Sequence, residues 1–200
     1  MKKNKNNSTI EEDILLLQGK AKNSSISIGE ILNILSEKGQ SLIILFLSLP
    51  FCQPLQIPGL SIPFGLAIAF IGLKMAFGKY AWLPKGILEK SISPRTLQKI
   101  TEKILWLLKK MKGWIYPRLA WMSYYPAAQI INGLLIFILG ILLALPLPIP
   151  LSNLTAAWSI LFIGLGLLKD DGVFILIGYF FSLFAFGSFV AMIFLVKLIF

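Results

Sequence analysis

The stretch that decides the fold is PLQIPGLSIPFGLAIAFIGL at residues 54–73, because it matches PLPIPLSNLTAAWSILFIGL at residues 146–165 without a gap. Nine of the twenty aligned positions are identical, and two prolines and a glycine are among them. Proline has no backbone N–H, so the carbonyl that would accept from it loses a hydrogen bond. Lipid offers no replacement donor for that carbonyl. The sequence therefore predicts an internal repeat of two proline-broken hairpins.

Working outward, we expect the first proline-broken membrane hairpin at 41–78, the second at 131–168 and a C-terminal membrane helix at 172–200. A spanning helix needs about 20 apolar residues, so the apolar stretch at 41–50 is too short alone. It is either completed by the helix before it or is a half-helix that turns back. The predicted fold class is an all-α polytopic membrane protein with about five membrane segments and re-entrant-like hairpins.

The composition supports a membrane protein and argues against most catalytic chemistry. Of the 200 residues, 56% are hydrophobic and 14% charged, and the mean hydropathy is +0.80. A soluble domain is about 45–50% apolar and about 25% charged. The chain has no histidine and one cysteine, Cys52, which excludes Ser-His-Asp and Cys-His sites, the usual zinc sites and an intrachain disulfide. We expect no enzyme, no metal and no cofactor.

Most of the region at 79–130 is basic, and it lies between the two hairpins. Within it, Ser93 and Pro94 have the order of an N-cap and a first-turn proline, and a cationic amphipathic helix with interspersed tryptophans follows. Such a helix is typical of the membrane interface, where it contacts anionic lipids. The patch sits between membrane segments, so we favour lipid over nucleic acid as its partner. The predicted lipid contacts are Lys99, Lys103, Lys109, Lys110 and Lys112.

The N-terminal region at 1–40 is polar and predicts two short amphipathic helices near the membrane. Ser8 with Glu11, and Ser27 with Glu30, have the spacing of a capping box. A glycine at position 39 is expected to end the second helix. The basic start is followed by no apolar core, so we expect no cleaved signal peptide.

Lysine and arginine mark the cytoplasmic side of a membrane. The N-terminus and residues 79–118 are therefore predicted to be cytoplasmic in a multi-pass protein of the bacterial inner membrane. The first hairpin must then leave this side and return to it. With Lys169 and the two aspartates after it also inside, the second hairpin has the same orientation and the C-terminus lies outside.

Polar side chains and prolines cluster at corresponding places in the two breaks. Interrupted segments at matching positions of two halves indicate a substrate site in transporters. Tight turns at the membrane surface, with solvated polar side chains, explain the pattern equally well. The candidate substrate-path or hairpin-tip residues are Gln53, Pro54, Gln56, Pro58, Ser61, Pro146, Pro148, Pro150, Ser152 and Asn153.

The order of several motifs resembles the ExoD family of exopolysaccharide synthesis membrane proteins. These motifs are PGLS at 58–61, GLKMAFGK at 72–79, Trp82-Leu83-Pro84, Ser93-Pro94-Arg95, LPLPIPLSN at 145–153 and GLGLLKDDG at 164–172. Where the family pattern reads like ERDG, this chain has KDDG. The resemblance implies an inner-membrane protein of exopolysaccharide synthesis or envelope assembly, with the polysaccharide-synthesis machinery as its protein partner. It implies no catalytic residues.

Two other classes of function compete with this accessory role. A transporter or flippase of a lipid-linked sugar or polyprenyl carrier would use the two broken hairpins as its substrate site. A membrane enzyme would need carboxylates near the interface. Asp170 and Asp171 are the adjacent candidates, and we interpret them as a solvated turn after a helix.

Overall fold

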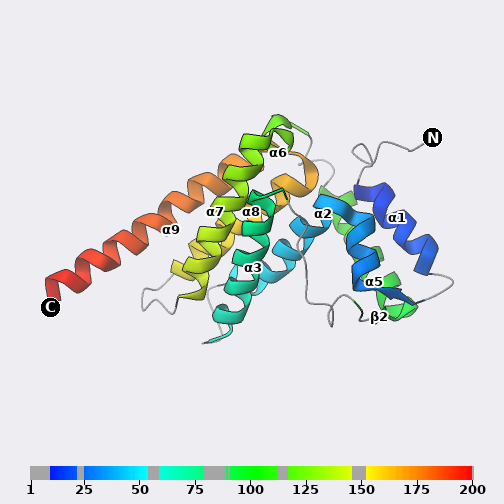
Figure 1. Cartoon of the computed structure of the whole chain (residues 1–200), viewed down its shortest axis with the longest axis horizontal. Helices are drawn as coiled ribbons and strands as arrows, with labels where there is room; N and C mark the ends of the chain where they lie inside the picture. Colours follow the sequence, from blue (N-terminus) through cyan, green and yellow to red (C-terminus); the bar gives the residue numbers. More distant parts are fainter. Residues whose placement is uncertain are drawn as a thin grey trace. The chain divides into compact units, whose positions relative to one another are not determined.

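The computed structural model describes residues 10–21, 25–53, 59–78, 89, 91–111, 117–145 and 152–199. The described chain is predominantly helical (Figure 1). It divides into two compact units. Unit 1 comprises Met1–Gly39 with Trp82–Tyr116, and unit 2 comprises Gln40–Ala81 with Pro117–Phe200.

Unit 1 contains helix α1 (Ile10–Ala21), the two-residue strands β1 (Ile26–Ser27) and β2 (Ser91–Ile92), and helix α5 (Pro94–Met111). The strands pair antiparallel, with Ile26 opposite Ile92. This ladder departs from the all-α prediction, and it forms where the buried side chain of Ile26 packs against Leu97 of α5. Helix α1 also packs against α5, so unit 1 has a small core of its own.

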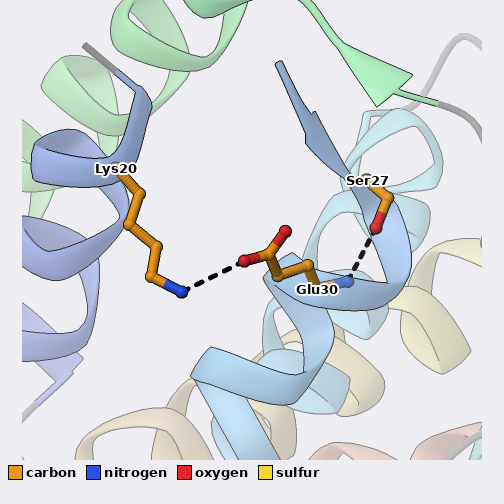
Figure 2. Close-up of polar contacts among 3 residues, drawn as sticks. All are labelled: Lys20, Ser27 and Glu30. Carbon is orange, nitrogen blue, oxygen red and sulfur yellow. Dashed lines mark hydrogen bonds and ion pairs between the residues drawn. The ribbon is translucent and has the colours of Figure 1, made fainter. Parts of the chain in front are cut away.

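The predicted cap of the second N-terminal helix is present. The Glu30 backbone N–H donates to the Ser27 hydroxyl at 3.2 Å, and Lys20 Nζ forms an ion pair with Glu30 Oε1 at 3.0 Å (Figure 2). Helix α2 begins at Ile28, directly after this cap. The capping spacing therefore predicted the start of α2 correctly, whereas Ser8 lies outside the described residues.

The predicted end of that helix at Gly39 is wrong, because α2 runs on to Ser48. The 21-residue helix thus joins the amphipathic segment to the first apolar stretch. Gly39, Gln40 and Ser41 are all buried. A glycine inside a helix costs about 1 kcal/mol relative to alanine, and burial of the surrounding helix outweighs that cost.

Most of the rest of unit 2, where the structure describes it, is made of helices that pack side by side in pairs (Figure 1). The elements that follow α2 are η2 (Leu49–Phe51), α3 (Ser61–Ala76), α6 (Trp121–Tyr124), α7 (Pro126–Ala144), α8 (Ser152–Lys169) and α9 (Gly172–Ile199). Helix α3 packs along α7, and α8 packs along α9. The final helix starts at the predicted position, after the turn at Asp170 and Asp171.

Small residues bring α3 and α7 into close antiparallel contact. A Cβ added to Gly65 would lie 2.6 Å from the backbone nitrogen of Ala144, and one added to Gly140 would lie 2.6 Å from that of Ala69. At the other end of the pair, a Cβ on Gly133 would lie 2.7 Å from Ala76 Cα. The backbones can approach this closely only because these positions carry no side chain, as in helix pairs of membrane proteins.

In each of the two proline-broken stretches, the second helix packs against the first helix of the other stretch. Gly72 of α3 packs against Ile136 and Phe137 of α7, and a Cβ there would lie 2.9 Å from Ile136 Cγ2. At an offset of 92 residues, Gly164 of α8 faces Leu45 and Ile44 of α2, and a Cβ added to Gly164 would lie 3.4 Å from Leu45 Cγ. The second helix of each stretch therefore contacts the first helix of the other at equivalent positions.

Candidate functional site

The first predicted hairpin tip falls between η2 and α3. Gln53 follows η2 and is exposed, and Ser61 is buried as the first residue of α3. Pro54, Gln56 and Pro58 lie outside the described residues. Phe51 and Phe64 bracket the gap with ring centroids 5.6 Å apart in an edge-to-face arrangement, so the two flanks of the break are in contact.

The second tip lies between the end of α7 and the start of α8. Asn153, in the first turn of α8, is half-buried, and its Oδ1 atom is fully buried with no hydrogen-bond partner among the described residues. Ser152 begins α8, although its side chain is not among those described. Pro146, Pro148 and Pro150 also lie outside the described residues. A buried amide oxygen without a partner costs about 1–3 kcal/mol.

The two tips lie at the same end of unit 2. Gly65, one turn into α3, meets Ala144 at the end of α7, and η2 packs against α8. Ser61 and Asn153 are therefore neutral polar side chains on the same end of the helix bundle. Such groups can donate and accept hydrogen bonds, but they supply no charge for acid–base chemistry.

The opposite end of unit 2 holds a hydrogen-bond network that the sequence analysis missed. Asn132 of α7 is completely buried, and its Nδ2 donates to the Met122 carbonyl at 2.8 Å. The Tyr179 hydroxyl of α9 donates to Asn132 Oδ1 at 2.8 Å. One side chain thus joins α6, α7 and α9. The sequence signal for this network was Asn132 itself, a polar residue inside an apolar run, because such residues are costly in lipid unless they are paired.

Asp171 is not the solvated turn that the sequence suggested. It is fully buried, and its Oδ1 accepts the Val173 backbone N–H at 3.0 Å, so the carboxylate caps the first turn of α9. The next residue, Gly172, donates its N–H to the Arg118 carbonyl at 2.6 Å. The preceding Asp170 adopts a φ of +57°. A carboxylate at a helix N-terminus stabilises the helix, so Asp171 has a structural role.

The predicted lipid contacts fall on α5, which starts at Pro94 as expected. Lys99 and Lys109 are exposed. The side chains of Lys103 and Lys110 are not among those described, and Lys112 lies outside the described residues. Among the described residues, no group of three or more His, Cys, Asp and Glu side chains is placed to hold a metal ion.

In the part of the chain that the structure describes, two helices are long and apolar enough to cross a membrane, at Pro126–Ala144 and Gly172–Ala191. The described part of unit 2 is thus a helical bundle with neutral polar side chains beside its two proline-broken stretches and a buried hydrogen-bond network at the other end. This chain belongs to the ExoD family, because the family described as "Exopolysaccharide synthesis, ExoD" matches residues 11–191.

Two curated proteins are similar to the chain. Protein ExoD of Rhizobium meliloti (strain 1021) is 36% identical over 159 residues, which cover 79% of this chain and 66% of that protein. An uncharacterized protein of Synechocystis is 30% identical over 159 residues, covering 79% of this chain and 74% of that protein. The alignment thus spans just under two thirds of the Rhizobium protein. No solved structure matches the chain significantly.

Proposed function

We propose that the protein is an integral inner-membrane protein that takes part in exopolysaccharide synthesis or envelope assembly and catalyses no reaction itself. Membership of the ExoD family supports the process. The exposed surface of unit 2 supports the location and is the observation that carries the proposal. In the 172–191 stretch only 22% of residues are buried, whereas the core helix of a soluble domain is mostly buried, and this difference supports a membrane location for α9.

The side chains that α7 and α9 expose are large and apolar. A soluble protein rarely exposes a contiguous apolar patch larger than a few hundred Å². Lipid is the environment in which such a surface costs nothing. The exposed residues include Ile130, Ile131, Leu134 and Ile138 on α7, and Leu176, Phe180, Leu183, Phe184, Val190, Ile193 and Phe194 on α9.

The 19-residue α7 is long enough to cross a bilayer, but the 28-residue α9 is ten residues longer than α8, and this difference supports a second hairpin that turns back before the outer surface. Gly166 of α8 packs against Ile175 of α9, and Gly178 of α9 packs against Ile163 of α8. This antiparallel register places Ser152, the start of α8, near Phe189. The last ten residues of α9 then continue about 15 Å past the hairpin tip at the helical rise per residue. With the N-terminus and 79–118 cytoplasmic, both hairpins enter from the cytoplasm and α9 alone reaches the outer surface.

Cysteine labelling tests this topology. In a Cys52→Ser background, Lys197→Cys in spheroplasts should react with a membrane-impermeant maleimide, because α9 ends outside. Gln53→Cys should react at least about tenfold more slowly until detergent is added, since lipid excludes charged reagents. Lys99→Cys serves as the cytoplasmic control and should react only after permeabilisation. Equal reaction of the first two cysteines would place the tip at the surface and contradict re-entrant hairpins.

Deletion and complementation test the function. Loss of the protein should lower cell-surface polysaccharide, measured as total hexose, and the parent sequence should restore it. Asp170→Asn should restore it equally, because asparagine tolerates a positive φ and the variant removes only the charge. Unchanged polysaccharide after deletion would refute the proposed process. A correctly inserted Asp170→Asn protein that failed to complement would instead favour an enzyme.

A further inference from the structure

Helix α5 has a buried face and an exposed face, and the buried face packs within unit 1. Leu97 is 2% exposed and packs with Ile26 and Ile31. Thr101, also 2% exposed, bonds its hydroxyl to the Leu97 carbonyl at 2.9 Å. This part of the apolar face therefore has a protein partner, whereas an interfacial helix inserts its apolar face into lipid.

The opposite face of α5 is exposed and mainly cationic. Arg95, Lys99, Trp106 and Lys109 are exposed along it, and Trp106 reaches 62% exposure. Lys99 and Lys109 lie about 15 Å apart along the axis. Glu102 also lies on this face, where it accepts a hydrogen bond from the Gln98 amide at 3.0 Å. We call Arg95, Lys99, Trp106 and Lys109 the cationic face.

The charge distribution indicates an anionic partner for unit 1. This unit contains 14 of the 19 Lys and Arg residues and 7 of the 9 Asp and Glu residues, which leaves it a net charge of +7. The chain passes between the units at residues 39–40, 81–82 and 116–117. Unit 1 is therefore covalently tethered at three places to the part of the chain that the proposal places in a bilayer.

We propose that the cationic face docks on the anionic phosphate headgroups of the bilayer that holds unit 2, with Trp106 at the headgroup level. The inference rests on the proposed membrane location. It differs from the interfacial helix expected from the sequence in how α5 contacts the membrane. Contact is electrostatic and peripheral, with the Leu97 side of α5 kept in protein. Lysine and arginine near an anionic surface act almost independently, so each charge removed weakens docking roughly fivefold.

Proteoliposomes of the full chain test the docking. A fluorophore on Gln98→Cys, in a Cys52→Ser background, reports proximity to quencher-labelled headgroups. Vesicles with phosphatidylglycerol should quench it strongly, and pure phosphatidylcholine vesicles or high salt should not, because salt screens surface charge. The combined variant Arg95→Gln, Lys99→Gln and Lys109→Gln should lose most of the quenching in phosphatidylglycerol.

Two controls separate charge from folding. The variant Arg95→Lys, Lys99→Arg and Lys109→Arg keeps the charge and should keep the quenching. Lys20→Gln removes a charge that is paired with Glu30 and should leave quenching unchanged. Equal quenching in both lipids, or no loss in the triple glutamine variant, overturns the proposal. So does stronger shielding of the label by a DNA oligonucleotide than by phosphatidylglycerol. If carbonate treatment extracts the parent chain from the vesicles, the proposed membrane location is refuted instead.

Discussion

Replacing Gly133 by alanine is expected to lower the melting temperature of the detergent-purified protein by about 2–12 °C. The new Cβ would lie 2.7 Å from Ala76 Cα and 2.8 Å from the Gly72 carbonyl oxygen. Both neighbours are backbone atoms, so α3 and α7 must move apart along their whole contact. Overpacking of this kind costs about 1–3 kcal/mol. Leucine at the same position should leave little folded protein, and circular dichroism during heating measures both effects.

Gly187 provides the matched control in an apolar helix. A Cβ on Gly187 meets no atom within 4 Å, so alanine there adds helix propensity without a clash. The expected change is a gain of about 0.5–1 kcal/mol, opposite in sign to that of Gly133→Ala. Equal melting temperatures for the two alanine variants would show that α3 and α7 do not pack as closely as described.

Replacing Asn132 by leucine is expected to cost about 2–4 kcal/mol, the second large effect. The change keeps the side-chain size but leaves the Met122 carbonyl and the Tyr179 hydroxyl without the partner that each has now. The Met122 residue is buried and Tyr179 is half-buried, so water replaces the lost amide poorly at the Met122 carbonyl. Thermal unfolding in detergent should show the loss as a fall of about 4–12 °C.

Tyr179→Phe separates the two halves of this network. It removes one hydrogen bond and leaves the bond from Asn132 to Met122 in place, so it should cost less than half as much as Asn132→Leu. In the Asn132→Leu background, Tyr179→Phe should cost nothing or restore stability, because it removes an unpaired hydroxyl. Tyr125→Phe, at an exposed tyrosine, is the neutral control. Additive losses from both substitutions would contradict direct coupling between Asn132 and Tyr179.

Local patterns predict where several helices begin. Ser27 with Glu30 marks the start of α2, Ser93 with Pro94 marks that of α5, and Gly172 follows the turn before α9. These signals are local because the first turn of a helix is capped by residues within three positions of it. Apolar runs likewise predict α7 and α9 as long helices, although α7 starts five residues before the expected boundary at 131.

Contacts between segments far apart in the chain could not be predicted from local sequence patterns. Gly39 has the local character of a helix end, and only the burial around it in the folded chain explains why α2 continues. Asp171 sits in a polar loop sequence, yet the Arg118 turn approaches Gly172 and the loop is covered. Small residues recur at intervals of four, three and four positions, at Gly65, Ala69, Gly72 and Ala76, which is the spacing of one face of a helix. The partner of this face on α7 could not be predicted, because many apolar helices offer similar faces.

The exchange of partners between the two broken stretches has a consequence for biosynthesis. Helix α3 emerges from the ribosome about 60 residues before α7, its partner. At about 5–20 residues per second, the glycine face of α3 waits roughly 3–12 s before α7 exists. The segment of α2 that meets Gly164 waits longer still. The first stretch therefore cannot complete its packing as an independent folding unit, and at the proposed membrane location the insertion machinery or lipid would shield it until the second stretch arrives.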